Sequence, residues 1–164
     1  MYLKFAGGDI FIILHKNTSL LKPVVFLIID DDVEDVELFC EAANEVSDHI
    51  YCLSASDGLE GLQILQDKNQ AQPDFIFLDL NMPRLSGKQF LQMYQKTTPN
   101  FTIPVIVYST SKLQADIEET KRLGATCFLT KPSKLRDLKD AISFILAGEW
   151  EKISSGHLVK NWNQ

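Results

Sequence analysis

Four short stretches of the sequence carry polar residues that could handle a phosphoryl group and a metal ion. LIIDDDVED contains three consecutive aspartates at positions 30–32, and FIFLDLNMP contains Asp79. Ser109 ends VIVYS, and Lys131 follows FLT. Carboxylates without His or Cys suit a hard cation such as Mg²⁺, while a lysine and a serine hydroxyl can contact phosphoryl oxygens. Together these residue types predict phosphoryl transfer at a site that binds Mg²⁺.

Asp79 is the predicted nucleophile. Close carboxylates repel one another, and they usually respond with a raised pKa or a bound cation. The aspartates at 30–32 therefore suit a shared metal, whereas Asp79 stands alone after its apolar run and could form an aspartyl phosphate. A single Asp after a strand is more often a turn former or a helix cap. Asp32 is assigned such a capping role, with Asp35 as its partner three residues on.

In each of the four stretches, the polar residues follow an apolar run that is predicted to be a buried parallel strand. With one further run, the five strands are expected at Val24–Ile29, Ile50–Ala55, 74–79, Val105–Ser109 and 125–130. Helical spacing follows each run, with Gly124 as a stop after residues 114–123 and a last helix after Ser133. Five such alternations predict a doubly wound α/β domain, in which ligands bind at the carboxyl ends of the strands.

The composition argues against several other functions. A net charge of −6, from 16 Lys and Arg against 22 Asp and Glu, disfavours a nucleic-acid or anionic-membrane binder. No apolar run approaches the roughly 20 residues of a membrane helix, and IFIIL is too short for a signal peptide. The three cysteines, Cys40, Cys52 and Cys127, are too scattered for a disulfide framework or a zinc site. We therefore expect a cytoplasmic protein with reduced thiols.

The length of 164 residues fits one domain with short appendages. Residues 1–22 are interpreted as an N-terminal extension, either an extra strand or a loose arm. Residues 23–147 hold the domain, and residues 148–164 form a C-terminal tail. This tail has too few apolar residues for a second core, so we expect no DNA-binding effector in it.

Read together and in order, the motifs LIIDDD, FIFLDLNMP, VIVYSTS and FLTKP resemble those of CheY-like response-regulator receiver domains of two-component signalling. The resemblance covers roughly residues 23–147. It implies a five-stranded, flavodoxin-like (βα)5 fold with strand order 2-1-3-4-5. LDLNMPRLSG and the lack of an output domain are most similar to small stand-alone regulators, including those paired with bacterial phytochrome kinases.

The resemblance also implies a role for each matching residue. Asp79 would accept the phosphoryl group, and Lys131 would contact one of its oxygens. Asp31 would bind Mg²⁺ directly and Asp30 partly through water. The backbone carbonyl of Asn81 would complete the protein's share of the metal ligands.

Other matching positions imply a switch. Phosphorylation would draw Ser109 toward the phosphate and let Phe128 turn inward, which would change the face formed by the fourth helix, fifth strand and fifth helix. The bond from Lys131 to Pro132 is expected to be cis, as in this family. One departure is the loop segment RLSG at 84–87, where the family often has Asp before the Gly; this loop lies outside the phosphorylation chemistry.

The leading hypothesis is a phosphoacceptor that is not an enzyme beyond self-dephosphorylation, with a sensor histidine kinase and a downstream protein as its partners. A haloacid-dehalogenase-like phosphotransferase is the main alternative. It requires Thr or Val at the fifth position of its first motif, where this chain has Glu34, and a late acidic pair that does not follow Lys131. A degenerate receiver acting only as an interaction module is a third, but the presence of every chemical residue argues against it.

The face between the fourth and fifth helices, near Leu113, Lys134 and Arg136, is a candidate homodimer surface. If phosphorylation reshapes this face, we expect a dimer only when Mg²⁺ and beryllofluoride are both present. Size-exclusion chromatography with light scattering measures this directly. An oligomeric state unchanged by the two reagents would contradict the prediction.

Overall fold

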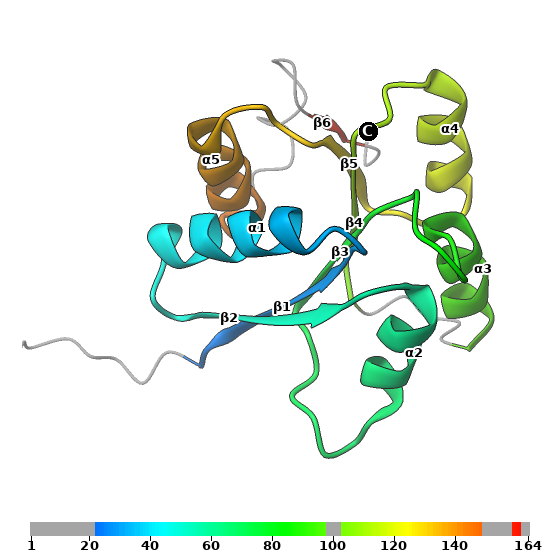
Figure 1. Ribbon diagram of the computed structural model, residues 1–164, viewed down its shortest axis with the longest axis horizontal. Coiled ribbons are helices and arrows are strands. Elements are labelled where there is room, and N and C mark those ends of the chain that lie inside the picture. Colours follow the sequence, from blue (N-terminus) through cyan, green and yellow to red (C-terminus); the bar gives the residue numbers. More distant parts are fainter. Residues whose placement is uncertain (1–21, 98–102, 149–158, 162–164) are drawn as a thin grey trace, which may run out of the picture.

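The structure is a computed structural model that describes residues 22–97, 103–148 and 159–161. Strands and helices alternate along the chain (Figure 1). The strands are β1 (Val24–Ile29), β2 (Ile50–Ala55), β3 (Phe75–Leu78), β4 (Val105–Ser109), β5 (Cys127–Thr130) and β6 (Val159–Asn161). The helices are α1 (Val33–Val46), α2 (Gly58–Gln66), α3 (Gly87–Thr97), α4 (Gln114–Arg122) and α5 (Leu135–Leu146).

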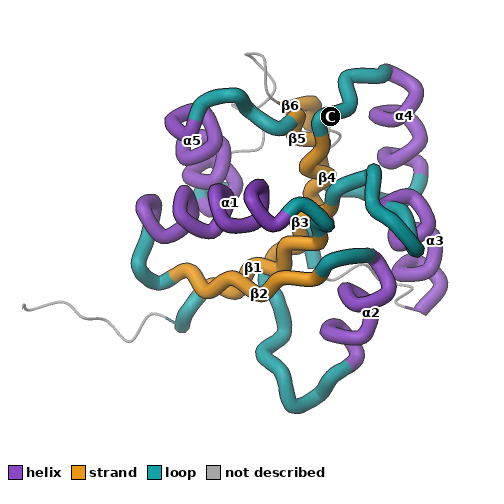
Figure 2. Tube along the Cα trace, in the orientation of Figure 1, coloured by secondary structure: helices purple, strands orange, loops and turns teal. Residues whose placement is uncertain are grey.

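The strands form one sheet in the order β2-β1-β3-β4-β5-β6. The first five are parallel, which confirms the predicted strand order 2-1-3-4-5. Figure 2 shows this single sheet in orange with helices on both sides. The short antiparallel strand β6 was not predicted, because it comes from the segment interpreted as a tail. It uses backbone groups that an edge strand such as β5 leaves unpaired.

Two apolar layers cover the sheet. In β1, Val25 and Ile29 pack in the layer under α2, α3 and α4, while Phe26 and Ile28 pack under α1 and α5. Figure 1 shows α1 and α5 together on one side of the sheet and the other three helices on the opposite side. Because both faces are covered, the strand is apolar throughout, as its continuous apolar run predicted.

An aromatic cluster anchors α1, the helix whose start lies beside the acidic motif. Phe39 of α1 is fully buried, and its ring centroid lies 4.5 Å from that of Phe77 in β3 and 5.3 Å from that of Tyr108 in β4. Such tilted contacts suit the quadrupoles of aromatic rings. They pack the second turn of α1 against β3 and β4.

Helix ends agree with the sequence at most positions. The Asp32 carboxylate accepts hydrogen bonds from the backbone N–H groups of Glu34 and Asp35, so it caps α1 as predicted. Gly124 has a φ of 89°, which suits its predicted role as the stop after α4. The last helix starts after Lys134 rather than directly after Ser133, and no side chain caps it.

The loop after β3 is packed tightly at Gly87. A Cβ at this position would overlap the backbone carbonyl oxygen of Asp79. Because backbone cannot give way as a flexible side chain does, Gly87→Ala is expected to lower the free energy of unfolding by about 1–3 kcal/mol. Urea denaturation measures the loss, and Gln92→Ala on the exposed face of α3 is the matched control. Equal stabilities for the two variants would contradict the close packing.

Candidate functional site

The acidic residues meet at the carboxyl ends of β1 and β3. These strands are neighbours with Ile29 opposite Leu78, so the residues that follow, Asp30 and Asp79, lie side by side. Asp30 and Asp79 are buried, whereas Asp31 is exposed. One carboxylate oxygen from each of the three lies within 4.8 Å of the others. The predicted metal-binding carboxylates are therefore brought together by the fold.

The spacing of these oxygens fits a single divalent cation. Two oxygens on opposite sides of one Mg²⁺ are about 4.2 Å apart, and those around the larger Ca²⁺ somewhat more. A mutual distance within 4.8 Å is close to that span. The Asp79 carboxylate is also oriented by the loop after β3, because its Oδ2 accepts a hydrogen bond of 2.8 Å from the backbone N–H of Asn81. The Asn81 backbone thus lies beside the acidic cluster, and the metal-binding role predicted for its carbonyl stays a prediction.

Lys131, at the carboxyl end of β5, supplies the positive charge of the site. Its Nζ lies 2.7 Å from Asp30 Oδ2 and 2.6 Å from Asp35 Oδ2, and only 10% of its side chain is exposed. The ammonium group also lies 5.4 Å from the ring centroid of Tyr108, within reach of a cation–π contact. The lysine is therefore held by protein groups close to the carboxylates, and its predicted contact with a phosphoryl oxygen stays a prediction.

Burial and nearby charges shift the pKa values of Asp30 and Lys131. Desolvation raises the pKa of the Asp30 carboxyl, and the nearby Asp79 charge adds to the rise, although hydrogen bonds from Lys131 and from the Asp32 backbone oppose it. Burial lowers the pKa of the Lys131 ammonium group, but its hydrogen bonds to Asp30 and Asp35 outweigh this and leave the pKa above its usual value. Lys131 is consequently a permanent cation within an acidic site.

Asp35 belongs to the site through a side-chain contact that the sequence did not predict. Its backbone N–H donates to Asp32 Oδ1 at 3.3 Å, as expected of a capping partner, but its carboxylate pairs with Lys131. The backbone N–H of Asp32 donates instead to Asp30 Oδ1, at 3.0 Å. An ammonium group is a stronger partner for a carboxylate than a neutral amide. The available signal was the position of Asp35 in the first turn of a helix that starts at the acidic edge.

The two predicted switch residues are both buried. Ser109 ends β4, and its Oγ accepts a hydrogen bond of 3.5 Å from the backbone N–H of Ser111. Phe128 of β5 is 1% exposed and packs in the layer under α2, α3 and α4. Phe128 therefore lies in the core of the structure. Their roles in switching stay predictions.

The expected cis bond before Pro132 is wrong for this structure. The described residues contain no cis peptide bond, so Lys131 and Pro132 are joined in trans. The trans isomer is favoured by about 0.5–1 kcal/mol for an ordinary X–Pro bond.

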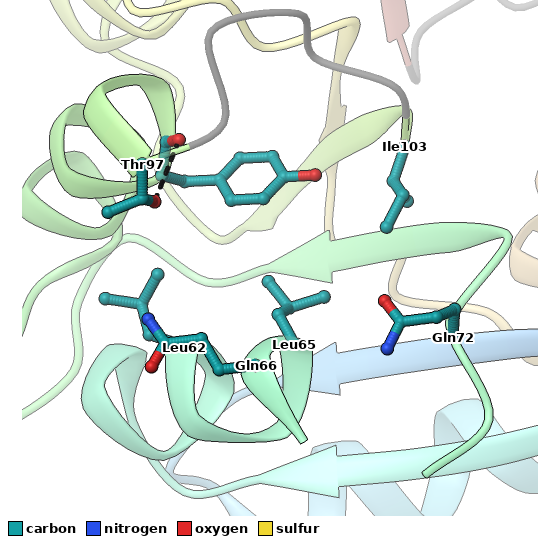
Figure 3. Close-up of a pocket in the computed structure, with 7 residues that line it drawn as sticks. Leu62, Leu65, Gln66, Gln72, Thr97 and Ile103 are labelled. Carbon is teal, nitrogen blue, oxygen red and sulfur yellow. Dashed lines mark hydrogen bonds between the residues drawn. The ribbon is translucent and has the colours of Figure 1, made fainter. Parts of the chain in front are cut away.

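A separate cavity of about 310 Å³ lies away from this chemistry (Figure 3). Its walls include Leu62 in the middle of α2, Gln66 at the end of α2 and Thr97 at the end of α3. Gln72 and Ile103, which precede β3 and β4, complete the opposite side. The cavity therefore sits at the amino ends of the strands, and none of the described residues that line it is a carboxylate or a lysine.

The cysteine thiols were expected to be reduced. Cys40, Cys52 and Cys127 are free of disulfide bonds in the structure, as predicted. Cys40 and Cys52 nevertheless lie close enough to interact, since a hydrogen bond to Cys52 lowers the pKa of the Cys40 thiol.

Every helix among the described residues is too short or too polar to cross a membrane. The cytoplasmic location stays a prediction.

Comparison with known proteins agrees with the fold and with the motifs. The model of the response regulator receiver domain matches residues 26–143. The chain is 31% identical to response regulator Rcp1 of Synechocystis sp. over 120 residues, which cover 71% of this chain and 82% of Rcp1. It is 35% identical over 106 residues to protein-glutamate methylesterase/protein-glutamine glutaminase 1 of Myxococcus xanthus. That similarity covers 65% of this chain but only 29% of the methylesterase.

Two solved structures are similar over most of the chain. One is the crystal structure of the Mn²⁺-bound form of Rcp1, with a TM-score of 0.66, 29% identity, and coverage of 83% of this chain and 99% of that one. The other is the phosphorylated cyanobacterial phytochrome response regulator RcpA, with a TM-score of 0.67, 27% identity, and coverage of 82% and 97%. The predicted fold class and the predicted similarity to stand-alone regulators are confirmed.

Replacing Lys131 by Met leaves Asp30 buried without its cation. The free energy of unfolding at pH 7 is expected to fall by about 3 kcal/mol, near the lower end for breaking a buried ion pair. Lys139→Met is the matched control, because Lys139 pairs with Glu45 at 2.7 Å on a more exposed surface, where a pair contributes about 1 kcal/mol or less. Equal losses in the two variants would contradict the importance of the Lys131 pair.

The effect of Lys131→Met should also depend on pH. A carboxyl whose pKa is higher in the folded state binds protons more tightly when folded, so its destabilising effect is present above that pKa and disappears as pH falls through it. Asp30 has a raised pKa, and losing Lys131 removes a group that lowers it. The difference in stability between wild type and Lys131→Met should therefore shrink at lower pH, as urea unfolding at a series of pH values would show.

Proposed function

The chain belongs to the response regulator receiver domain family, and from this premise we propose that Asp79 is its phosphoacceptor. The observation that carries the proposal is the meeting of three carboxylates and a lysine at one edge of the sheet. Asp79 is buried there, and its carboxylate is oriented by the Asn81 backbone. A nucleophile held in one orientation next to a cation site is what in-line phosphoryl transfer requires.

The donor in this proposal is the phosphohistidine of a sensor histidine kinase. An Asp79 oxygen forms a bond to phosphorus while the bond from phosphorus to the histidine nitrogen breaks. The electron pair of that bond remains on the imidazole ring. The acceptor carboxylate must approach as the anion. Lys131, at the carboxyl end of β5, lowers the electrostatic cost of that charge, because its own charge also interacts with Asp79.

A divalent cation, which we propose to be Mg²⁺, would be held by Asp30, Asp31, Asp79 and the backbone carbonyl of Asn81. When bound, it supplies positive charge next to the phosphoryl oxygens. Three clustered carboxylates in a set without His or Cys support a hard cation. Asp30 is already shared with Lys131, which agrees with its proposed role as the more indirect metal ligand.

The output of this reaction is proposed to be a change in a protein-binding face. Ser109 and Phe128 lie on neighbouring strands, and Phe128 is opposite Val107, two residues before Ser109. Movement of the Ser109 hydroxyl toward a phosphoryl group would remove its contact with the Ser111 backbone, at the start of the loop into α4. The face of α4, β5 and α5 is therefore the proposed surface for a downstream protein or for a second copy of the chain.

We propose no enzymatic turnover for the chain beyond self-dephosphorylation. The methylesterase relative is matched over only 29% of its length, so its activity is not transferred to this chain. The receiver match over residues 26–143 favours the phosphoacceptor over the haloacid-dehalogenase-like alternative.

The proposal predicts that acetyl phosphate and Mg²⁺ phosphorylate the wild-type protein and that Asp79→Asn abolishes this, because an amide cannot act as the nucleophile. Intact-mass spectrometry measures the added phosphoryl group, and EDTA should prevent it. Asp48→Asn, at a side chain that is 90% exposed, is the matched control and should behave as wild type. Stoichiometric phosphorylation of Asp79→Asn would show that another residue is the acceptor.

A further inference from the structure

A second ion pair lies beside the proposed site and involves residues outside the phosphorylation motifs. Asp57 caps α2, and its Oδ1 accepts hydrogen bonds from the backbone N–H groups of Leu59 and Glu60 at 2.8 and 3.0 Å. The Asp57 side chain is fully buried, and its other oxygen, Oδ2, pairs with the guanidinium of Arg84. Arg84 comes from the loop between β3 and α3, so this pair joins the start of α2 to the segment that follows Asp79.

The backbone of Arg84 adopts a conformation that is uncommon for a residue with a side chain. Arg84 has a φ of 59°, and it is the one non-glycine residue with positive φ in the part of the chain that the structure describes. Residues other than Gly and Asn adopt this left-handed backbone region at an energetic cost, and they remain in it where the surrounding structure holds them. The buried Asp57 carboxylate is the partner that can hold Arg84 there.

Further contacts fasten the same loop on both sides of Arg84. The Gly58 backbone N–H donates to the Leu85 carbonyl at 3.3 Å, and a Cβ on Gly58 would lie 2.9 Å from that oxygen. At the other end, the Gly87 backbone N–H donates to the Leu80 carbonyl at 3.2 Å. These contacts join the two ends of the loop beside Asp79 and place it against the start of α2.

This loop carries the backbone of Asn81, which donates to Asp79 Oδ2 and lies at the proposed cation site. We propose that Arg84 is a positioning residue: by pairing with Asp57 it holds the loop of residues 80–86 so that the Asn81 backbone is preset beside Asp79 for the cation. The inference rests on the proposed function, because it concerns affinity for the cation of that site. Arg84 itself touches none of the three clustered carboxylates in any described contact.

The experiment measures Mn²⁺ affinity, which needs no phosphorylation. Free Mn²⁺ is followed by electron paramagnetic resonance during titration of the full-length wild type, Arg84→Ala, Arg84→Lys and Asp57→Asn. Loss of an outer residue that orients metal ligands typically costs 10–100-fold in affinity. We expect the dissociation constant to rise roughly tenfold in Arg84→Ala, at the lower end of that range, with partial recovery in Arg84→Lys.

Asp57→Asn separates positioning from a simple contribution to folding. Asparagine is as good a helix cap as aspartate, so α2 keeps its cap while the ion pair with Arg84 is lost. We expect its Mn²⁺ affinity to fall as in Arg84→Ala. The double variant Asp57→Asn/Arg84→Ala should lose no more than either single variant, since all three remove one interaction. It also leaves no buried charge unpaired, so it remains testable if Arg84→Ala fails to fold.

Hydrogen exchange gives a second readout that is independent of metal. The Asn81 amide, which is bonded to Asp79, should exchange faster in Arg84→Ala and in Asp57→Asn, whereas amides in β1 should keep their protection. Arg122→Ala, at an exposed arginine in the last turn of α4, is the matched control and should change neither readout.

The outcomes distinguish this proposal from the proposed function. Wild-type Mn²⁺ binding that is lost in Asp31→Asn, together with Mn²⁺ affinities of the folded Arg84 and Asp57 variants within twofold of wild type, would overturn the positioning role alone. Strictly additive losses in the double variant would overturn it as well. Wild type without Mn²⁺ binding would overturn the proposed cation site, and the positioning role with it.

Discussion

Repulsion among carboxylates at one sheet edge is the constraint on which the rest of the site depends. Asp30, Asp31 and Asp79 bring oxygens within 4.8 Å of one another, and two of the three side chains are buried. Water cannot screen such charges well, so their repulsion must be balanced by cations close by. Lys131 supplies one positive charge from β5, and the geometry suits a divalent ion for the rest. Because the clustered carboxylates repel one another without cations, binding of a cation or phosphorylation of one carboxylate can change the electrostatic energy of the site strongly.

The surrounding fold is organised to maintain this arrangement. Phe39 anchors α1 over Phe77 and Tyr108, and the first turn of α1 brings Asp35 to Lys131. On the other side of the site, Gly87 permits the loop after β3 to lie against the Asp79 backbone. Both arrangements use packing between segments that are distant in sequence. This packing keeps the charged side chains at fixed positions, although their mutual repulsion would otherwise move them apart.

The parts of the structure that were predictable are those with strong local signals. β1, β2 and β4 occupy the ranges expected from their apolar runs, and Asp32 caps α1 as its position before the helix indicated. The parts that were missed depend on long-range pairing. Asp35 had a plausible local partner in Asp32, and only the approach of Lys131, 96 residues away, gave it a better one. Strand β6 was missed because three residues carry too weak an apolar pattern.

The sequence by itself determined the order of strands and helices, the residue types at the carboxyl ends of the strands, and the family. It could do so because strand burial and helix capping act over a few neighbouring residues, and because the motifs occur in a characteristic order. Only the tertiary structure decided which charges share a partner: Lys131 with Asp30 and Asp35, and Arg84 with Asp57. Those choices depend on distances between side chains from separate strands and loops, and a Coulomb interaction is set by distance in space and by burial, neither of which is written in sequence spacing.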